Sequence, residues 1–342
     1  MFKVFFAIAS CLSALASENA LRGETITSFL DDSDEWKQFS NFQDRFSKKY
    51  ENFQEVETRF QIFRTNLRNI IIHNLDHSQN FTMGINQFTD LTPNEFKAQY
   101  VSGLKATVGG TSCGSFSSSA SGAPSAIDWR NKGAVTSVKD QGQCGSCWTF
   151  SATGAVEGAW AISKGQLIDL SEEQLVECAG LKYGSMGCSG GIMEGAFNYV
   201  IEHGQCSDSS YPYTSGTGQS GSCKSCSSVA HLSSCSDVKP NDQISLKGAL
   251  AQQPVSVAIS ADTRVFQSYT SGVITSSSCY TSLDHGVLAV GYGTENGIEY
   301  WLVKNSWGES WGMNGYVKIG RSDSTNDAGI CGIAMDASFP TV

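Results

Sequence analysis

The hydrophobic residues change their spacing partway along the chain, and this change limits the folds that the chain can adopt. Apolar side chains recur at threes and fours over 146–164 and 191–203, which indicates helices. Beyond Pro254 they alternate instead, which indicates strands. The alternating segments are 255–259, 286–292, 300–304 and 316–319. Helices followed by strands predict an α+β fold with two lobes and a cleft between them.

The first sixteen residues have the pattern of a secretory signal peptide. Lys3 precedes an apolar run over 4–15, and Ala14-Leu15-Ala16 provides small residues at a cleavage position. The run is too short to span a membrane, and no later segment is long and apolar enough, so we expect no membrane association. The signal predicts the secretory route, ending in a lysosome, a digestive vacuole or the extracellular space.

Two helical patterns and a tract of small residues follow this signal. The apolar faces of the two patterns carry Trp36, Phe39, Phe42 and Phe46, then Phe60, Phe63, Leu67 and Ile70. Residues 109–122 are rich in Gly, Ser and Ala around Cys113, which predicts a flexible, protease-accessible linker. The expected domains are therefore a signal over 1–16, a helical segment with its linker over 17–122, and a body over 123–342.

The net charge argues against nucleic acid as a partner. The chain carries a formal charge of -10 and has no dense run of Lys or Arg. An acidic protein of this kind is compatible with an acidic compartment.

A cysteine stands where a glycine-rich loop gives way to a helix, within the segment 141–150. Cys147 begins the helical pattern, and the unpaired N–H groups and positive dipole of a helix N-terminus lower the pKa of a thiol. This placement predicts a possible nucleophile. Cys144-Gly145-Ser146-Cys147 is also a Cys-x-x-Cys sequence, so a redox pair or a structural disulfide explains the segment as well.

A thiolate needs a base, and His285 is the best placed of the five histidines. It opens a strand pattern in Asp284-His285-Gly286, where a glycine lets the backbone approach a ligand. The next strand leads into Asn305-Ser306-Trp307-Gly308, whose amide could orient an imidazole while the indole shields that hydrogen bond from water. Taken alone, His285 is equally explained as a structural hydrogen-bonding residue.

Together, these three motifs resemble the papain-like cysteine proteases, and their order along the chain is the same. The helical segment resembles the ERFNIN-type pro-domain of the cathepsin L-like branch, and 84–90 resembles the second motif of that pro-domain. The matching ERFNIN positions are Glu55, Arg59, Phe63, Asn66, Ile70 and Asn74. The resemblance implies a two-lobed papain-like fold, with a helical lobe and a β-barrel-like lobe, made as a zymogen. It also implies that the pro-domain inhibits the enzyme.

The resemblance implies a role for each residue of the motifs. Cys147 is the expected nucleophile, His285 the acid and base, and Asn305 the residue that orients His285. Gln141, with the backbone N–H of Cys147, is expected to form the oxyanion hole, and Trp307 to shield Asn305. The expected reaction is peptide hydrolysis by an endopeptidase through a thioester. No metal or cofactor is expected; the expected partners are protein substrates and possible cystatin-type inhibitors, and the protein is expected to be a monomer.

The family resemblance also assigns most of the 12 cysteines. It implies the pairs Cys144 with Cys188, Cys178 with Cys223, and Cys279 with Cys331, which would leave Cys147 free. Cys206 with Cys226 is a guess. If Cys113 pairs with Cys235, the linker would stay attached after it is cut.

By the same resemblance, one pocket selects the substrate residue that precedes the acyl residue of the cut bond. Gly190 and Gly191 are expected to pair with extended substrate backbone. The expected walls and neighbours of the pocket are Met193, Ala258, Leu283, Asp284, Gly286 and Asp336, with Trp307 nearby. Apolar walls predict a preference for Leu, Phe or Val, and Asp336 predicts acceptance of Arg as well, fading at low pH. Loss of charge on carboxylates such as Asp90 is expected to loosen the pro-domain at low pH.

Overall fold

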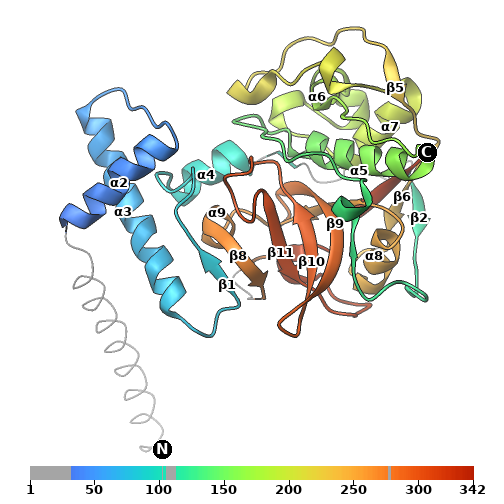
Figure 1. Cartoon of the computed structure of the whole chain (residues 1–342). Coiled ribbons are helices and arrows are strands. Elements are labelled where there is room, and N and C mark those ends of the chain that lie inside the picture. Colours follow the sequence, from blue (N-terminus) through green and yellow to red (C-terminus); the bar gives the residue numbers. More distant parts are fainter. Residues whose placement is uncertain (1–31, 102, 105–112, 276–278) are drawn as a thin grey trace, which may run out of the picture. The chain divides into compact units, whose positions relative to one another are not determined.

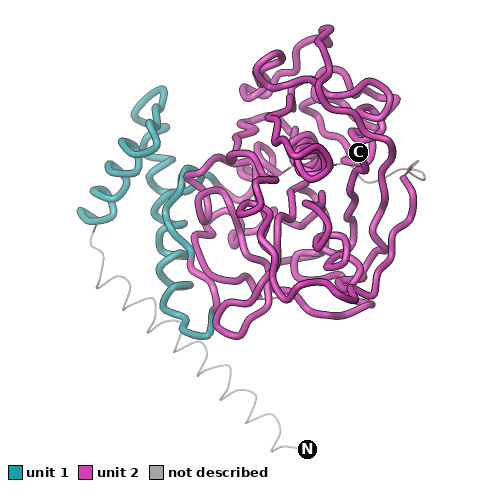
Figure 2. The backbone as a smooth tube through the Cα atoms, turned by 45° about the vertical axis from the view of Figure 1, so that its right-hand side comes forward, with its two compact units in different colours: residues 1–79, 83–91 teal, residues 80–82, 92–342 magenta. Residues whose placement is uncertain are grey.

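The computed structural model describes residues 32–101, 103–104, 113–275 and 279–342. The expected signal peptide over 1–16 lies outside these residues. The chain divides into two compact units, which Figure 2 shows in different colours. The first contains the described residues up to 79 together with 83–91, and the second contains 80–82 and the described residues from 92 onward.

The first unit is a pair of helices, α2 (Asp32–Arg45) and α3 (Phe53–Leu75). Both apolar faces predicted from the sequence contribute to its core, in which Phe39, Phe42 and Phe63 are buried and their rings lie 5.0–6.0 Å apart. Asn52 caps α3 by accepting a hydrogen bond from the backbone of Glu55. Aromatic packing between the two helices therefore accounts for this small core.

The polar ERFNIN positions attach segment 83–91 to α3. Asn66 donates to the carbonyls of Thr89 and Leu91 at 2.8 and 2.9 Å, and Asn74 pairs with both backbone groups of Met83. Arg59 donates to the carbonyl of Asp90. Side-chain amides satisfy the backbone of an irregular segment in this way, which explains why polar residues stand on this face of the helix.

The second unit combines α-helices with a large mixed sheet, as Figure 1 shows. The helices are α4 (Pro93–Tyr100), α5 (Cys147–Lys164), α6 (Glu172–Cys178), α7 (Met193–His203), α8 (Gln243–Leu250) and α9 (Arg264–Ser268). The strands of the ten-stranded sheet, in spatial order, are β1 (Phe81–Met83), β8 (Tyr269–Ile274), β11 (Tyr316–Gly320), β10 (Ile298–Lys304), β9 (His285–Glu295), β7 (Val255–Ile259), β12 (Ala337–Thr341), β6 (Ser234–Val238) and β2 (Gly114–Phe116), while β3 (Ile127–Asp128) pairs with β9. Strands β4 (Gln205–Cys206) and β5 (Ser228–Ala230) form a separate pair.

Helix α5 packs closely on strand β9 and joins the helical part of this unit to the sheet. A Cβ on Gly154 would meet Leu288 at 2.6 Å, so the glycine permits the close approach. Ser151 donates to the carbonyl of Val287 at 2.7 Å, which fixes the helix against the strand. The N-terminus of α5 is thereby held next to the start of β9.

The α+β fold class predicted from the spacing is confirmed, and so are the helices and strands that carried it. Ser171 caps α6, because its hydroxyl accepts from the backbone of Gln174 at 3.0 Å. Strands β1 to β6, β8 and β12 were not expected. The linker prediction is wrong for residues 114–116, which form β2; residues 109–112 lie outside the described chain.

Five disulfides cross-link the second unit. Three are the pairs that the family resemblance implies, Cys144–Cys188, Cys178–Cys223 and Cys279–Cys331. The other two are Cys206–Cys226 and Cys113–Cys235. Among the described cysteines, only Cys147 is free.

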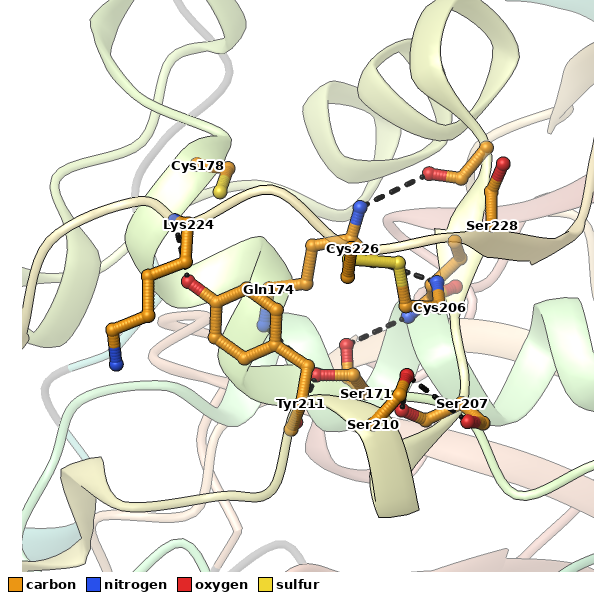
Figure 3. Close-up of a disulfide and its surroundings, with 12 residues drawn as sticks. Ser171, Gln174, Cys178, Cys206, Ser207, Ser210, Tyr211, Lys224, Cys226 and Ser228 are labelled. Carbon is orange, nitrogen blue, oxygen red and sulfur yellow. Dashed lines mark hydrogen bonds between the residues drawn. A yellow bond between two sulfur atoms is a disulfide. The ribbon is translucent and has the colours of Figure 1, made fainter.

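The Cys206–Cys226 bridge lies within a hydrogen-bonded frame, which Figure 3 shows. The backbone N–H of Cys206 donates to Gln174 at 2.7 Å, and its carbonyl accepts from Ser171 at 2.9 Å. The hydroxyl of Tyr211 accepts from the backbone of Lys224 at 2.9 Å. The bridge thus joins the loop of Cys226 to strand β4, which is itself hydrogen-bonded to the start of helix α6.

Candidate active site

Cys147 is the first residue of helix α5 and is fully buried. Ser146 precedes the helix without capping it by its side chain, so the first turn keeps N–H groups that can stabilise a negative charge. The backbone N–H of Gly286 donates to the Cys147 sulfur at 3.3 Å. Because Gly286 follows His285 directly in β9, this hydrogen bond brings the thiol next to the histidine.

His285, Asn305 and Trp307 form a buried cluster at the start of β9 and the end of β10. Nε2 of His285 donates to Oδ1 of Asn305 over 2.8 Å in the tautomer that an amide oxygen requires. The ring of Trp307 stacks on the imidazole, with centroids 4.7 Å apart and planes 24° apart. Nδ1 of His285 is buried and has no hydrogen-bond partner among the described residues. It is therefore the nitrogen free to exchange a proton.

Burial keeps both reactive groups neutral. It raises the pKa of the Cys147 thiol to about 12, although the N–H groups of Gly286 and Trp148 lower it in part. Burial also lowers the pKa of His285 to about 4, against a smaller opposite effect of Asn305. Between these values, burial in this covered state favours a thiol and a neutral imidazole over an ion pair.

Backbone of residues 103–104 covers the thiol. The carbonyl of Gly103 accepts a hydrogen bond from the N–H of Gly191 at 3.0 Å, and Leu104 forms a parallel bridge with Gly191. A Cβ on Gly103 would lie 2.6 Å from the carbonyl oxygen of Gly145 and 2.8 Å from the Cys147 sulfur. Only glycine fits without a shift in this position.

Helix α4, just before these residues, contacts the same cluster. Thr92 and Glu95 form a capping box at its start. Phe96 is buried and meets Trp307 edge to face, with centroids 5.2 Å apart. Lys97 pairs with Asp262 at 2.6 Å. We call residues 93–104 the covering segment.

Asp284, which directly precedes His285, lies next to Asp262, the partner of Lys97. Its carboxylate accepts from the backbone N–H of Ala261 at 2.8 Å. Burial, reinforced by the neighbouring charge of Asp262, raises the pKa of Asp284 to about 7. The two carboxylates and Lys97 therefore form a charged group at the edge of the cluster.

Gln141 is held in place from both ends of its amide. Its Nε2 donates to the carbonyl of Cys144 at 2.9 Å, while its Oε1 accepts from the hydroxyl of Ser306 at 2.7 Å. The backbone N–H of Gln141 also donates to the carbonyl of Ser306. The disulfide Cys144–Cys188 fixes the loop, so Cys144 is not half of a redox pair with Cys147. An amide fixed in this way is suited to an oxyanion hole.

Several expected pocket residues come together on neighbouring elements. Ala258 and Gly286 face each other across β7 and β9, and the N–H of Ala258 donates to the carbonyl of Asp336 at 2.9 Å. The sulfur of Met193 lies 3.2 Å from where a Cβ of Gly286 would be. Leu283 packs at the margin of the same hydrophobic core, and Gly190 and Gly191 border Met186 and the covering segment, respectively.

Asp336 belongs to a group of acidic residues that the sequence did not reveal. Glu194 follows Met193, is buried, and accepts from the Ser338 hydroxyl at 2.6 Å. Burial and the charge of Asp336 raise the pKa of Glu194 to about 7. Burial and Asp237 likewise raise the pKa of Asp336. The sequence signal that could have revealed this group is Glu194, an acidic residue within the otherwise apolar helical pattern over 191–203.

Tyr213 is a second residue that sequence reasoning missed. Its hydroxyl donates to the carbonyl of Gln141 at 2.9 Å and shares a hydrogen bond with the hydroxyl of Ser146 at 2.8 Å. It therefore links the loop of Gln141 to the residue before Cys147. No local pattern around Tyr213 predicts this, because the contact spans 72 residues.

Buried charges lie behind the catalytic strand. Lys139 pairs with Glu172 at 2.7 Å, and Lys304 donates to the hydroxyl of Thr136 at 3.1 Å. Burial raises the pKa of Glu172 to about 7 and lowers that of Lys304. These groups line a small cavity of about 20 Å³ with Asn305 and Ser306. They join the elements that carry the catalytic residues.

The described residues offer no metal site and no membrane span. Nowhere in these ranges do three or more His, Cys, Asp or Glu side chains gather so that they could hold a metal ion. None of the described helices is both long and apolar enough to cross a membrane.

Two family models match the chain. The model described as papain family cysteine protease matches residues 123–341, and the model described as cathepsin propeptide inhibitor domain (I29) matches residues 39–96. The second match lies within the helical segment that was expected to be a pro-domain.

Known proteins with similar sequences and structures include plant and insect proteases. A probable cysteine protease RD21C of Arabidopsis thaliana is 47% identical over 300 residues, which cover 86% of this chain and 65% of that protein. A senescence-specific cysteine protease SAG39 of Oryza sativa subsp. indica is 39% identical over 346 residues, covering 99% and 98%. The digestive procathepsin L 3 of Tenebrio molitor has a TM-score of 0.81 at 39% identity and covers 90% of this chain and 99% of its own.

These matches extend over both units of the structure. The chain spans 65% of the length of the Arabidopsis relative and almost the whole length of the rice relative. The chain therefore belongs to the papain family of cysteine proteases and carries a cathepsin-type inhibitory propeptide domain.

Proposed function

We propose that this chain is the precursor of a cysteine endopeptidase and that Cys147, His285 and Asn305 hydrolyse the peptide bond. The observation that carries the proposal is the arrangement at the start of α5. There a lone free thiol, hydrogen-bonded by Gly286, lies beside a histidine whose far nitrogen is already bound to Asn305. Such an arrangement of nucleophile, base and orienting group supports acyl transfer.

The chemistry follows from the two nitrogens of His285. Asn305 holds Nε2–H, so Nδ1 accepts the proton of the Cys147 thiol once the covering segment has left. The thiolate attacks the substrate carbonyl carbon and forms a C–S bond, and Gln141 Nε2 and the N–H of Cys147 stabilise the oxyanion. Collapse breaks the C–N bond, and His285 gives its proton to the leaving amine. Water, deprotonated by His285, then hydrolyses the thioester.

Latency in this proposal has two physical parts. Gly103 and Leu104 pair with the backbone of Gly191, which would otherwise pair with an extended substrate. Their cover also desolvates Cys147 and His285, which disfavours the ion pair. Removal of the covering segment would therefore both open the site and charge it.

The substrate preference rests on the residues around Met193 and Asp336. Met193, Ala258 and Leu283 provide apolar surface for Leu, Phe or Val, and Asp336 provides a carboxylate for Arg. Because burial and Asp237 raise the pKa of Asp336, its charge is lost at a higher pH than that of an ordinary carboxyl. Acceptance of Arg should thus fade as the pH falls, while apolar residues stay accepted.

A pair of fluorogenic peptides tests this preference. The ratio of Arg-Arg to Phe-Arg cleavage should fall several-fold in Asp336→Ala, and in the wild type it should fall with decreasing pH. Asp237→Ala is a second test, since loss of its charge should lower the pKa of Asp336 and let acceptance of Arg persist to a lower pH. A ratio that does not change in Asp336→Ala contradicts a role for Asp336.

The proposal includes the biological setting. The signal over 1–16 and the five disulfides support passage through the secretory pathway. A lysosome, a digestive vacuole or the extracellular space is the proposed destination. The proposed partners are protein substrates, the chain's own propeptide and cystatin-type inhibitors, and the mature protein is proposed to be a monomer.

Labelling with an epoxide thiol inhibitor tests the catalytic residues. The acid-treated protein should be modified at Cys147 alone, and Cys147→Ser should be unlabelled and inactive. Asn305→Ala should still be labelled at Cys147, but more slowly, since His285 loses its orienting partner. A melting curve of each variant separates loss of chemistry from loss of folding. Modification of any other residue overturns the assignment.

A further inference from the structure

The segment just before the body is covalently attached to it. Cys113 forms a disulfide with Cys235, 122 residues later, and Cys235 is buried in strand β6. This bond lies on a stretch that the sequence indicates as a linker to be cut away. Residues 113–122 are named here the anchored segment.

The anchored segment also forms part of the main sheet. Its strand β2 pairs in parallel with β6, with Gly114 opposite Ser236 and Phe116 opposite Val238. The N–H of Lys239 then donates to the carbonyl of Phe116 at 2.8 Å. Because the other side of β6 pairs with β12, β2 completes the sheet at this edge, as Figure 1 shows. Its removal would expose a row of unpaired backbone groups on β6.

Side chains dock the anchored segment further. Phe116 meets Phe339 of β12 edge to face, with centroids 5.1 Å apart. The N–H of Ser118 donates to the hydroxyl of Ser245 on α8 at 3.0 Å. A Cβ on Gly248 would come within 2.3 Å of the Ser118 hydroxyl, so α8 leaves room for this contact by having a glycine there.

The contacts continue into the start of the body. Ala120 and Gly122 have positive φ values of 53° and 76° and make a turn, in which the N–H of Ala123 donates to the carbonyl of Ala120. Tyr292 of β9 then donates to the carbonyl of Pro124 at 2.9 Å. Contacts to the body therefore recur between Cys113 and Pro124. A protease would have to displace a paired strand to cut within 114–116.

We propose that residues 113–122 remain in the mature protease as its N-terminal strand, because the cut that removes the inhibitory part falls before Cys113. The proposal rests on the proposed function, in that the precursor is processed by proteolysis. It replaces the boundary at residue 122 that the sequence predicts. The mature enzyme then keeps all five disulfides and a covered β6 edge.

Sequencing the N-terminus of processed protein tests the proposal. The inactive precursor Cys147→Ser is treated at low pH with a trace of an added aspartic protease, and the wild type is left to process itself. Intact mass without reduction should show one chain that begins at or before Cys113. A mature N-terminus after residue 113 overturns the proposal. Failure of the wild type to process itself contradicts the proposed function instead, while the Cys147→Ser fragment still reports the boundary.

The anchoring bond can be tested with a double variant. In Cys113→Ser with Cys235→Ser, the processed enzyme should melt about 5–10 °C lower, since a disulfide closing a long loop stabilises a domain substantially. Its N-terminus should also move downstream toward residue 123. Ser115→Ala, in the same strand but exposed, is the control and should change neither quantity. An unchanged melting temperature and N-terminus in the double variant contradict the anchoring role.

Discussion

The covering segment and the anchored segment both precede residue 123, yet they are attached to the rest of the unit in different ways. The covering segment lies on Cys147 and Trp307, and its contacts include a backbone hydrogen bond, a ring contact and an exposed ion pair. The anchored segment is held by a disulfide and a paired strand, and its contacts are to β6, β12 and α8. Non-covalent contacts thus hold the segment at the candidate active site, whereas a covalent bond holds the segment at the sheet edge.

This difference separates latency from stability. A segment that inhibits must be able to leave, so it should not be held by a covalent bond. A strand that completes a sheet gains from every contact that keeps it there. Each substitution in the covering segment has a matched substitution in the anchored segment or close to it.

The largest difference between the precursor, in which the covering segment is present, and the processed enzyme is expected in the ionisation of Cys147. With its pKa raised to about 12 and that of His285 lowered to about 4, both groups are neutral between these values in the precursor. Alkylation by iodoacetamide between pH 5 and 8 should be about a thousandfold slower in the precursor than in processed enzyme, and should rise steeply with pH.

Mass spectrometry of Cys147 across pH 4–9 measures this. A cover that acts only by blocking access would slow alkylation by the same factor at every pH. Equal pH slopes in precursor and processed enzyme would therefore remove the ionisation part of the proposal. Cys147→Ser gives the background.

Gly103→Ala should release much of the latency. The added Cβ meets backbone at 2.6 Å and the catalytic sulfur at 2.8 Å, so the segment must shift. Such overpacking destabilises the covered state by about 1–3 kcal/mol. Labelling of Cys147 in the precursor should therefore rise about 10- to 100-fold. Gly114→Ala is the matched variant in the anchored segment, where the nearest atom is 3.7 Å away. Its labelling rate should match the wild type; equal rates in both variants would contradict the cover.

Phe96→Leu should have a smaller effect of the same kind. It keeps apolar volume but loses the edge-to-face contact with Trp307, which corresponds to about 0.5–1.5 kcal/mol. Precursor labelling should therefore rise about 2- to 10-fold. Phe116→Leu removes the equivalent contact with Phe339 and should instead lower the melting temperature of the processed enzyme without changing latency. A rise in precursor labelling in Phe116→Leu, without a change in melting temperature, would contradict the roles assigned to the two segments.

Lys97→Ala should have the smallest effect. The ammonium is mostly exposed where it pairs with Asp262, and exposed ion pairs contribute about 0.2–1 kcal/mol. We expect precursor labelling to increase by about fivefold or less, and the increase to disappear in 0.5 M salt. Lys239→Ala, which breaks the pair with Asp242 near the anchored segment, is the control. A salt-independent increase would point to a different role for Lys97.

The fold could be predicted where periodicity was strong. Helix α5 and strands β9 to β11 follow runs of apolar residues long enough to show their own period. Strand β2 could not be predicted, because Gly114-Ser115-Phe116 has no strand pattern of its own. This segment is extended because it pairs with β6, whose residues lie more than a hundred positions later in the chain.

The catalytic cluster shows the same division. Short motifs contain Gln141, Cys147, His285 and Asn305, so their residue types and order were enough to propose them as catalytic residues. Tyr213 was not found, because a single tyrosine in a loop becomes meaningful only when it reaches Gln141 and Ser146. The neutral state of the thiol was also missed. It depends on burial, which no motif encodes.

By itself the sequence determined the α+β class, the helical segment in front of the body and the catalytic motifs, because each is encoded within a few neighbouring residues. Tertiary structure alone decided which distant groups meet. It paired Cys113 with Cys235 across 122 residues and laid Gly103 over Cys147. The physical reason is that burial, strand pairing and disulfide geometry depend on packing between remote segments, and local spacing carries no information about that packing.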